Sequence, residues 1–512
     1  MPSPFVERLS IVAGSSRIAI EDDAIQRSFP DLLGRALRVR GALCEGARSL
    51  EGERVALLAS PGAAWVEAFV GIVLAGGIAL PLSPLYPSAE LAWFLEDAGA
   101  RRLIVSDDLL DLAGPLAAGR IVLRVGDVAG APLRGESAAA DLEPDAAALL
   151  LYTSGTTGRP KGALLTHGNL ATQAALLREA WQVSEDDTLL HALPLHHLHG
   201  LGISLLTALL AGCRVRMLPC FDAARVASEL ARRAATTFMA VPTMYQRLFE
   251  HVDRAGAANR RAFEAGARAL RLATSGSAAL PVTLAGRWRD LTGAIPLERF
   301  GMTEIGVGMS NPLEPGARRA GWVGPPLPTV EARIVDDAGA ESAAGPGELW
   351  VRGPSVFQRY LGREEATAAA FQDGWFRTGD VAERAEDGFV RLLGRTSVDI
   401  LKSGGYKLSA LEIEEALREH GAIAEVAVVG IPDEAWGDRV VAVVVPAPGR
   451  EAECTTDAIR AWAKERLAPY KAPHQVIAVP SLPRNAVGKV VKPDLVRAIA
   501  AMTATAKGTL GQ

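Results

Sequence analysis

The chain has little cysteine and no closely spaced cysteine pair. Its 512 residues include four cysteines, Cys44, Cys213, Cys220 and Cys454, and no C-x-x-C motif. This spacing excludes a cysteine-based metal cluster and is typical of reduced thiols in a cytoplasmic protein. We therefore expect the cysteines to be small, buried, hydrophobic residues.

The sequence also lacks a long apolar run. The longest, from Ala68 to Leu82, is interrupted by residues that include Gly76, Gly77 and Pro81, and it is shorter than the roughly 20 apolar residues that a spanning helix needs. Residues 1–20 contain no secretory core, and the acidic Glu7 is unlike a transit peptide. We expect a soluble protein of the cytoplasm with no membrane span.

Neither sign of charge is in large excess. The formal net charge is -5, so the electrostatic footprint of a nucleic-acid-binding protein is absent. Hydrophobic residues make up 49% and charged residues 22%, as in ordinary globular proteins. The length favours one large domain and a smaller one, and it leaves open whether the protein is a monomer or a homodimer.

Short apolar runs alternate with amphipathic stretches over most of the chain. Residues 55–58, 78–80 and 103–106 are typical of strands, and 63–74 and 90–97 of helices. Further helices are expected at 169–181, 200–210 and 222–232, and further strands at 189–192, 214–218, 237–240, 271–274 and 295–298. The alternation predicts parallel strands with crossover helices, and so a layered α/β fold.

The pattern of predicted secondary structure changes twice towards the C-terminus. After about Val323, frequent turns and short strands indicate a β-rich subdomain that extends to about residue 395. Beyond Arg395 the pattern predicts a self-contained α+β module of roughly a hundred residues, with a capping box at Ser409-x-x-Glu412. We expect an N-terminal domain over 1–395 and a small, mobile C-terminal domain over 396–512.

One loop suggests a nucleotide. The segment Tyr152 to Gly162 reads Tyr-Thr-Ser-Gly-Thr-Thr-Gly-Arg-Pro-Lys-Gly and follows an apolar strand at 146–151. Small hydroxyl and glycine residues let backbone N–H groups converge on a phosphate, and Lys161 adds a positive charge. The spacing is not that of a Walker loop, and a plain surface turn of the same composition remains the alternative.

Later segments carry groups that a nucleotide site needs. Phe300 and Gly301 could form a stacking surface for a purine, and Glu304 could hold a hard divalent cation. Asp380 follows a tight turn and, as an acceptor-only group, could bind both hydroxyls of a ribose. Lys489 lies after a glycine on a C-terminal loop. Each segment alone has a simpler explanation as core, turn or solvated surface, but their joint occurrence in this order favours nucleotide chemistry.

Together these motifs resemble the ordered signature of the acyl-adenylate-forming superfamily, which includes acyl-CoA synthetases, peptide-synthetase adenylation domains and firefly luciferase. The resemblance covers nearly the whole chain. The motifs are Tyr152 to Gly162, Pro194 to Gly200, Glu298 to Glu304, Thr378-Gly379-Asp380, Gly394-Arg395, Ser403 to Lys407 and the Lys489 loop.

The resemblance implies a role for each matching residue. Thr153, Ser154, Gly155, Thr156, Thr157, Gly158 and Lys161 would hold the ATP phosphates; Gly276, Ser277, Ala278, Phe300 and Gly301 would frame the adenine; Asp380 and Arg395 would bind the ribose; Gly404, Gly405 and Tyr406 would face the thiol acceptor; Thr303, Glu304 and Lys489 would be catalytic, with Glu304 and Thr156 on Mg²⁺.

The implied activity is ligation of an acid to coenzyme A at the expense of ATP. The carboxylate attacks the α-phosphate to give an acyl-AMP and pyrophosphate, and a thiol then displaces AMP. In this superfamily the small domain rotates between the two steps. The hinge residue is ambiguous among Ser397, Val398 and Asp399, because the usual pair of charged residues after Gly-Arg is missing here.

Two arginines indicate which acid is used. Arg299 precedes the Phe-Gly-Met-Thr-Glu motif, where this superfamily is usually neutral, and Arg247 follows Val241 to Gln246. Arginines converging on an acyl pocket, with His197 and Ser277 beside it, would be costly to bury without an anion. A dicarboxylic acid would supply one, and the pattern looks like the malonyl-CoA synthetase branch, with malonate or a methylated malonate as substrate.

Three alternatives remain. Either arginine could pair with an internal carboxylate such as Glu298 or Glu250, which would leave a short- or medium-chain fatty acyl-CoA synthetase. A peptide-synthetase adenylation domain is disfavoured because no acid in the Pro194 to Gly200 region would meet an amino group. A silent nucleotide-binding relative is disfavoured because Lys489, Glu304 and Asp380 are all present.

Overall fold

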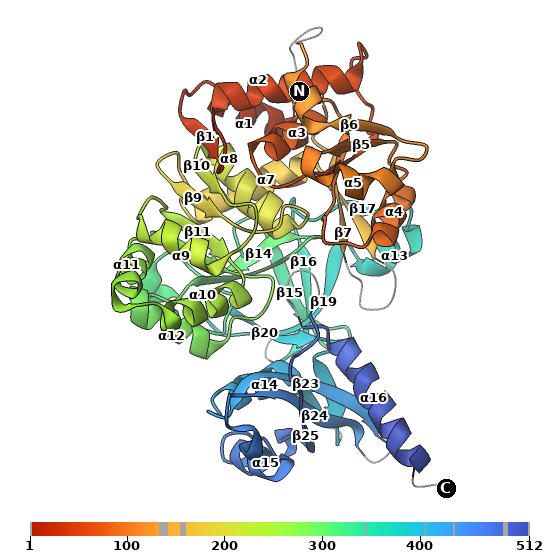
Figure 1. Cartoon of the computed structure of the whole chain (residues 1–512). Helices are drawn as coiled ribbons and strands as arrows, with labels where there is room; N and C mark the ends of the chain where they lie inside the picture. The colour runs from red at the N-terminus through yellow and green to blue at the C-terminus, as the bar shows by residue number, and fades with distance from the viewer. Residues whose placement is uncertain are drawn as a thin grey trace. The chain divides into compact units, whose positions relative to one another are not determined.

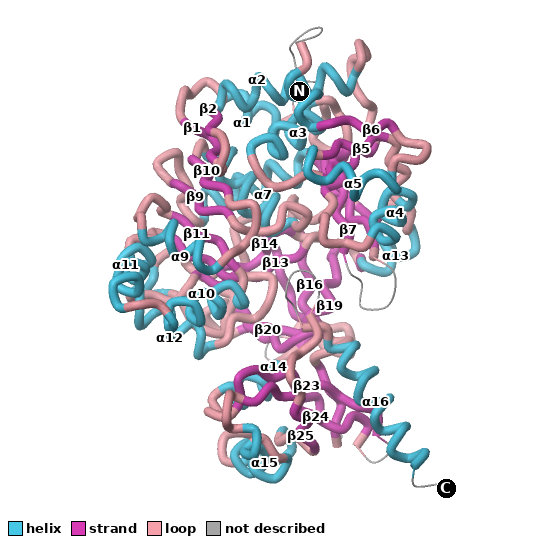
Figure 2. Tube along the Cα trace, in the orientation of Figure 1, coloured by secondary structure: helices cyan, strands magenta, loops and turns pink. Residues whose placement is uncertain are grey.

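The computed structural model describes residues 3–132, 142–153, 160–342, 345–404, 406–433, 436–484 and 490–509. Helices and strands alternate along most of the chain (Figure 2), and the layered α/β fold that the sequence predicts is confirmed. The chain divides into two compact units. The first contains Met1–Leu280, Arg287–Glu331 and Val351–Phe376, and the second contains Pro281–Gly286, Ala332–Trp350 and Arg377–Gln512.

An eight-stranded sheet of order β14-β13-β12-β11-β9-β10-β1-β2 forms one layer of the first unit. From β1 to β13 every neighbouring pair is parallel, and only β2 and β14 at the two edges are antiparallel. The parallel arrangement follows from the strand–helix alternation of the sequence. The strands are β1 (Ile18–Glu21), β2 (Gln26–Ser28), β9 (Thr188–His191), β10 (Arg214–Met217), β11 (Thr237–Ala240), β12 (Leu272–Ser275), β13 (Leu297–Met302) and β14 (Gly306–Ser310).

A seven-stranded sheet of order β17-β8-β7-β4-β3-β5-β6 forms another layer of the same unit. Strands β7 and β8 are antiparallel, with Thr153 opposite Lys161, so both ends of the predicted phosphate loop lie side by side. Residues 154–159 between them lie outside the described residues. The strands are β3 (Arg54–Leu58), β4 (Ile78–Pro81), β5 (Arg102–Val105), β6 (Ile121–Arg124), β7 (Ala147–Thr153), β8 (Lys161–Thr166) and β17 (Arg359–Tyr360).

Helices cover these sheets in the first unit (Figure 1). The predicted helix at 63–74 is confirmed as α3, whose residues are almost all buried. The principal helices are α1 (Pro4–Val12), α2 (Phe29–Cys44), α3 (Ala63–Leu74), α4 (Ser88–Asp97), α6 (Val125–Gly130), α7 (His167–Ala180), α8 (Thr207–Ala211), α9 (Ala223–Ala231), α10 (Pro242–Arg254), α11 (Ala257–Arg268) and α12 (Val282–Thr292).

One predicted helix has a different form. The sequence predicts an α-helix at 200–210, whereas the structure has a π-helix, η3 (His199–Leu206), followed by α8. Gly200 accounts for part of the difference, because a Cβ there would lie 2.1 Å from the carbonyl oxygen of Pro194. The close approach of that backbone permits only glycine, and hydrophobic periodicity does not detect the wider helical turn. π-Helical turns frequently occur at functional sites.

A third sheet follows the order β15-β16-β19-β18, with β20 paired to β19. Pairs β18–β19 and β19–β20 are antiparallel and joined by short turns. This confirms the strand-rich sequence pattern expected after residue 323. The elements are β15 (Glu331–Val335), β16 (Gly347–Arg352), α13 (Glu364–Ala370), β18 (Phe371–Gln372), β19 (Trp375–Arg384) and β20 (Val390–Arg395).

The C-terminal part of the second unit is a sheet with helices on both faces. Along β23 and β24, alternate residues such as Val428 and Val429 enter two separate cores, as the period of two of a strand requires. Helices α14 and α15 contribute to one core and α16 to the other (Figure 1). The elements are β21 (Ile400–Ser403), β22 (Tyr406–Ser409), α14 (Ala410–Arg418), β23 (Ile423–Asp433), β24 (Gly437–Pro446), α15 (Thr456–Lys464), β25 (Gln475–Ala478) and α16 (Lys492–Thr509).

The capping box expected before α14 forms only by half. The Ser409 side chain accepts a hydrogen bond from the Glu412 backbone N–H, as predicted. The return bond is replaced, because the Glu412 carboxylate binds the Lys471 ammonium at 2.6 and 2.8 Å. The Ser409 hydroxyl also donates a hydrogen bond to the carbonyl oxygen of Leu393 at 2.5 Å. A distant cation therefore competes successfully for the carboxylate.

The cysteine prediction holds at three positions of four. Cys44, Cys213 and Cys454 are buried free thiols, but Cys220 is exposed. Cys220 lies in the connection between β10 and α9, where no sheet or helix covers it. In the part of the chain that is described, no helix has both the length and the apolar character needed to cross a bilayer.

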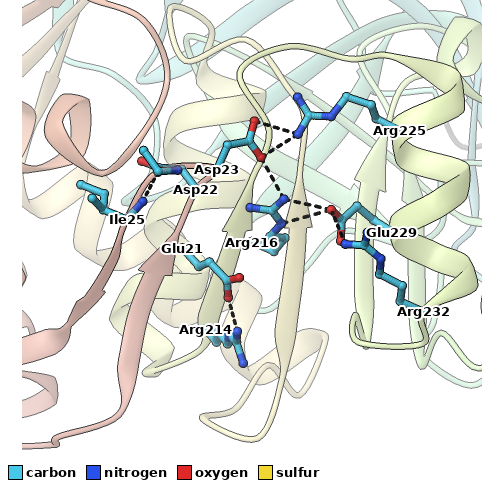
Figure 3. A network of polar contacts seen from close by, with 10 residues as sticks. Glu21, Asp22, Asp23, Ile25, Arg214, Arg216, Arg225, Glu229 and Arg232 are labelled. Atoms are coloured by element: carbon cyan, nitrogen blue, oxygen red, sulfur yellow. Dashed lines mark hydrogen bonds and ion pairs between the residues drawn. The ribbon is translucent and has the colours of Figure 1, made fainter.

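Ion pairs fasten the N-terminal strand β1 to its neighbours (Figure 3). Asp23 accepts hydrogen bonds from Arg216 at 3.0 Å and from Arg225 at 2.7 Å, and Arg216 also binds Glu229 at 2.9 Å. Arg225 and Glu229 lie on α9, and Arg216 lies on β10. The network therefore joins the edge of the sheet to a covering helix. The hydrogen bond from Arg225 is the main reason why the pKa of Asp23 is lowered.

A second, more buried network holds the starts of β9, β11 and β12. Both oxygens of Asp187 accept hydrogen bonds from Arg271, at 3.0 and 2.6 Å, and Thr236 donates to Asp187 at 2.7 Å. Arg271 also donates to the carbonyl oxygen of Trp181 at the end of α7. Burial alone would raise the pKa of Asp187, but the bonds from Arg271 and Thr236 outweigh it and lower the pKa.

Replacing Asp187 should therefore destabilise the first unit. Asp187→Asn removes the charge that Arg271 binds, and we expect a loss of about 2 kcal/mol in the free energy of unfolding. The difference from wild type should be full above about pH 4, the ordinary pKa of Asp, and should shrink as the pH falls through the lower folded-state value. Urea unfolding at several pH values measures both effects.

The neighbouring residue provides the control. Asp186 pairs with Arg17 on the surface, so Asp186→Asn should change stability by less than about 0.5 kcal/mol. Equal losses in the two variants, or no pH dependence of the difference for Asp187→Asn, would contradict the role given to Asp187.

Candidate active site

The candidate residues of the first unit gather where parallel strands end. Gly276 and Ser277 follow β12, Phe300 lies near the end of β13 with Glu304 just beyond it, and His199 begins the π-helix. In open α/β sheets the carboxyl ends of strands are the usual place for ligands. The fold therefore brings together segments that are about a hundred residues apart in the sequence.

Glu304 is the centre of one polar group. Its side chain is buried, and Oε1 accepts hydrogen bonds from the Thr153 hydroxyl at 3.3 Å and from the Tyr360 hydroxyl at 2.9 Å. The Lys161 ammonium lies 5.2 Å from the centre of the Tyr360 ring. The structure thus places Thr153, Lys161 and Glu304 together, as a phosphate and metal site requires. Thr303, the neighbouring candidate, is half-buried at the end of this segment.

Phe300 and Gly301 lie on β13 against β14. Phe300 is buried opposite Met309, and a β-bulge separates it from Gly301. A Cβ on Gly301 would lie 2.1 Å from the carbonyl oxygen of Gly306. The glycine is therefore required by the close approach of β14, independently of any ligand. Whether the Phe300 ring stacks on adenine stays a prediction.

Arg299 is a buried cation without a counter-ion in the described part of the chain. It is 3% exposed, and its Nε and Nη2 atoms have no hydrogen-bond partner among the described residues. Burial lowers its pKa to about 9, so the guanidinium remains charged at neutral pH. A buried unpaired charge is strongly unfavourable, so an anion bound beside Arg299 would lower this cost.

The internal carboxylates suggested as partners are used elsewhere. Glu298 accepts a hydrogen bond from the Leu280 backbone N–H at 3.1 Å, and Glu250 accepts one from Gln246 at 3.1 Å. Glu298 and Arg299 are consecutive on β13, so their side chains point to opposite faces of the strand. Among the described residues, burial is the only influence on the pKa of Arg299, and neither carboxylate contributes to it.

The guanidinium of Arg299 lies against Gly276. A Cβ added to Gly276 would be 2.5 Å from both Cζ and Nε of Arg299. Ser277, the next residue, has a positive φ of 68°, a conformation that is uncommon outside glycine, asparagine and aspartate. Its hydroxyl bonds to Nδ1 of His199 at 3.0 Å, while Ala278 beside it is exposed. The segment after β12 is therefore shaped around Arg299 and His199.

The three histidines of the Pro194 to Gly200 motif, of which His199 contacts this segment, are neutral at physiological pH. Burial lowers the pKa of His196 to about 3 and that of His197 to about 4. The pKa of His199 is held well below its usual range by burial and then by the positive charge of Arg299. The rings of His196 and His197 are 4.2 Å apart. The group formed by Arg299, Gly276, Ser277 and His199 therefore carries a single positive charge.

The second arginine proposed for the acid has a different environment. Arg247 is exposed on α10, and its guanidinium lies 5.1 Å from the centre of the Phe221 ring. The structure therefore places one of the two arginines in a buried setting and leaves the other at the surface. A role for Arg247 in binding the acid stays a prediction.

In the second unit, Asp380 and Arg395 form a pair. They are opposite each other on the antiparallel strands β19 and β20, and Arg395 Nε is 3.1 Å from Asp380 Oδ1. Asp380 is buried, and its backbone N–H donates to the Thr378 hydroxyl. The structure brings together the two residues proposed for the ribose, although their sequence positions differ by fifteen.

The residues proposed for the thiol lie on a surface of the same unit. Gly404 has a φ of 58°, and its backbone N–H donates to the carbonyl oxygen of Trp436. Tyr406 is exposed and stacks on Tyr470 with ring centres 4.4 Å apart. Several candidates lie outside the described residues, namely Ser154, Gly155, Thr156, Thr157, Gly158, Gly405 and Lys489.

Comparison with protein families identifies this arrangement. Residues 11–361 match the AMP-binding enzyme family, and residues 412–489 match the C-terminal domain of AMP-binding enzymes. The chain belongs to the AMP-binding enzyme family. The superfamily resemblance of the motifs is thereby confirmed.

Several relatives of this AMP-binding enzyme carry names that state an activity. The mitochondrial malonate–CoA ligase of Mus musculus is 40% identical, over 95% of this chain and 89% of that protein. The malonate–CoA ligase of Arabidopsis thaliana is 39% identical, over 94% of this chain and 86% of that protein. The crystal structure of ATP-bound MatB from Rhodopseudomonas palustris matches with a TM-score of 0.88 and 36% identity, over 97% of this chain and 98% of that chain.

Two residues of this AMP-binding enzyme site were not predicted from sequence. Tyr360 reaches Glu304 from β17, about fifty residues downstream, and nothing in its local sequence marks it. His199 lies in the Pro194 to Gly200 motif, but the sequence prediction named His197 from that motif. Only the fold shows that it is His199 whose Nδ1 bonds to Ser277 beside Arg299.

Gly276→Ala tests the packing on Arg299. The added methyl group must displace the guanidinium, so we expect a loss of about 1–3 kcal/mol in the free energy of unfolding. Gly126→Ala is the matched control, because a Cβ there meets nothing within 4 Å and the variant should be as stable as wild type or slightly more stable. Chemical denaturation measures both. A Gly276→Ala protein with wild-type stability would show that Arg299 is not held against this glycine.

Proposed function

We propose that this chain is an ATP-dependent malonate–CoA ligase that forms malonyl-CoA, or methylmalonyl-CoA, through an acyl-AMP intermediate and releases AMP and pyrophosphate. The observation that carries the proposal is the buried cation Arg299, which has no counter-ion among the described residues. The names of the relatives with about 40% identity support it, as does the likeness to ATP-bound MatB.

A dicarboxylic acid meets the needs of this site. One carboxylate reacts with ATP, and the second is an anion that the guanidinium can bind with two parallel hydrogen bonds. A monocarboxylic acid would supply only an alkyl group and leave Arg299 buried and unpaired. The neutral state of His196, His197 and His199 means that these three side chains add no positive charge of their own, and their ring nitrogens can act as neutral hydrogen-bond partners.

The reaction divides into two displacements. A carboxylate oxygen attacks the α-phosphorus of ATP, the bond to the bridging oxygen breaks, and pyrophosphate leaves. The sulfur of coenzyme A then attacks the carbonyl carbon of the acyl-AMP, the bond to the AMP oxygen breaks, and the thiol proton is released. Negative charge builds on phosphate oxygens in the first step, which is where preorganised positive charge is most effective.

The phosphate end of the nucleotide is assigned to the Glu304 group. Thr153 and Lys161, with Ser154, Gly155, Thr156, Thr157 and Gly158, would bind the β- and γ-phosphates, and Lys489 would approach the α-phosphate. Glu304 fits Mg²⁺, because the ion needs only one or two carboxylates beside the phosphates, and Glu304 offers a buried carboxylate next to Lys161 and Thr153. When bound, Mg²⁺ supplies positive charge to the phosphate oxygens. Thr156 would be its second protein ligand.

The remaining assignments cover the nucleoside and the thiol. Gly276, Ser277, Ala278, Phe300 and Gly301 would frame the adenine, and Asp380 with Arg395 would bind the ribose. Gly404, Gly405 and Tyr406 would face coenzyme A, and Thr303 would act beside Glu304. Arg247, His197 and Ser277 would assist Arg299 in binding the acid. We propose that the functional boundary between the nucleotide-binding domain and the C-terminal domain lies between residues 395 and 396.

Location is a separate part of the proposal. Free thiols at all four cysteines suit a reducing compartment, and we propose the cytoplasm. The relative from Mus musculus is named as mitochondrial. Fractionation of cells that express the full chain distinguishes the two locations.

Arg299→Leu tests the choice of acid. Loss of a buried charge pair costs about 4 kcal/mol, so kcat/KM for malonate should fall about 10³-fold. The same constant for propionate should fall less than about 10-fold, since propionate has no second carboxylate. Pyrophosphate release with each acid measures both constants. Equal losses for malonate and propionate would refute the assignment of malonate to Arg299.

Replacing each of two lysines by alanine tests whether they have distinct roles in the nucleotide site. Lys489→Ala should slow adenylation about 10²- to 10³-fold, because it removes charge from the transition state, but should leave thioester formation from supplied malonyl-AMP within a few-fold of wild type. Lys161→Ala should mainly raise the KM for ATP. Pyrophosphate release and thioester formation are followed separately. If both variants lost the second half-reaction equally, the two lysines would not have distinct roles.

A further inference from the structure

A buried lysine at the start of α16 joins two carboxylates of the second unit. Lys492 is 9% exposed, and its ammonium lies 2.5 Å from Asp399 Oδ1 and 2.7 Å from Glu414 Oε1. Burial disfavours the charged ammonium, but the two carboxylates outweigh this effect and raise the pKa of Lys492. Neither the motifs nor the proposed chemistry uses Lys492.

The two carboxylates have different additional partners. Glu414 lies on α14 and also accepts hydrogen bonds from the Val428 backbone N–H and from Arg418. Asp399 lies in the connection between β20 and β21, and its second oxygen accepts a hydrogen bond from the Arg395 backbone N–H at 3.1 Å. Removing the lysine therefore leaves Glu414 with a cation, whereas Asp399 keeps only backbone partners among the contacts described for it.

The connection that carries Asp399 is a tight turn. The backbone N–H of Asp399 donates to the carbonyl oxygen of Arg395 at 2.8 Å, and that of Thr396 donates to Gly379 at 3.0 Å. Gly394 has a φ of 126°, and a Cβ there would lie 2.4 Å from the Cβ of Asp399. The position of Asp399 thus determines the backbone of Arg395.

Arg395 in turn holds Asp380. Its Nε lies 3.1 Å from Asp380 Oδ1, and the two strands that carry these residues are paired at that point. A chain of contacts therefore leads from Lys492 through Asp399 to the backbone of Arg395 and, through the Arg395 side chain, to Asp380. Every member of this chain lies in the second unit.

From this chain we infer that Lys492 is a positioning residue for the pair Asp380 and Arg395, and that it acts through Asp399. The inference rests on the proposed function, in which this pair binds the ribose of ATP. Lys492 touches no substrate in this role. It holds Asp399 in the place where Asp399 fixes the Arg395 backbone, and so it sets the geometry with which Asp380 meets the two ribose hydroxyls.

The test compares binding of ATP with binding of 2′,3′-dideoxy-ATP. Calorimetric titration of the full chain, without an acid, gives both affinities. Wild type should bind ATP about 10- to 100-fold more tightly, because two hydrogen bonds to a charged group are lost in the analogue. Lys492→Met should reduce this ratio to less than about 3, and the KM for ATP should rise while the KM for malonate stays within about 2-fold of wild type.

Three further variants make the test specific. Lys492→Arg keeps the charge and should restore most of the ratio. Asp399→Asn should reproduce the loss by removing the acceptor charge, and it replaces Lys492→Met if that variant does not fold. Arg497→Met is the control, because Arg497 lies on the same helix and pairs with Asp494 at the surface. Its ratio should equal that of wild type.

The outcomes separate the inference from the proposed function. A wild-type protein that discriminates the two nucleotides but does not use malonate would refute malonate as the substrate and leave the inference standing. A wild-type protein that binds both nucleotides equally would refute it. A lower melting temperature of Lys492→Met with an unchanged ratio would also refute it, since the lysine would then be purely structural.

Discussion

A buried charge without an internal partner is the constraint on which the candidate site depends. Arg299 is placed by the parallel pairing of β13 with β12, and it stays charged at neutral pH although burial lowers its pKa. The neighbouring residues leave room for the charged guanidinium and add no positive charge. Gly276 leaves room for the guanidinium, and the imidazole of His199 stays neutral beside it. Such an arrangement is unfavourable for folding by itself and is understandable as a binding site whose ligand completes the charge balance.

The same chain contains a second buried cation, Lys492, which differs from Arg299 in having internal counter-ions. Lys492 has two carboxylates within 2.7 Å, whereas Arg299 has none in the described structure. The chemistry of the side chains fits this difference. A planar guanidinium binds a carboxylate through two parallel hydrogen bonds and suits an exchangeable ligand, while a compact ammonium with three donors can join several fixed acceptors. Burial alone therefore does not distinguish a cation that binds a ligand from one that holds the fold; the presence or absence of internal partners does.

The sequence predicted the layers of the fold better than the contacts of the site. Strand and helix positions follow from apolar periodicity, which is a local property, and α3 was predicted with its observed bounds. The π-helix was missed because apolar periodicity does not register the close packing of Gly200 against the carbonyl oxygen of Pro194. The capping box formed by half because Lys471 competes for Glu412. Tyr360 and Lys492 reach their partners across more than fifty residues, and no local pattern encodes such contacts.

The glycines of the motifs can be explained by packing before any ligand is considered. Gly276 is excluded from bearing a side chain by Arg299, Gly301 by the carbonyl oxygen of Gly306, and Gly200 by that of Pro194. None of these three has a positive φ, so the reason is close approach and not backbone flexibility. A sequence match to these motifs therefore indicates, in part, how β12, β13 and the π-helix pack together. This explains why a motif specifies the framework of the site, whereas the acid proposed for the site depends on one further side chain, Arg299, for which Gly276 leaves room.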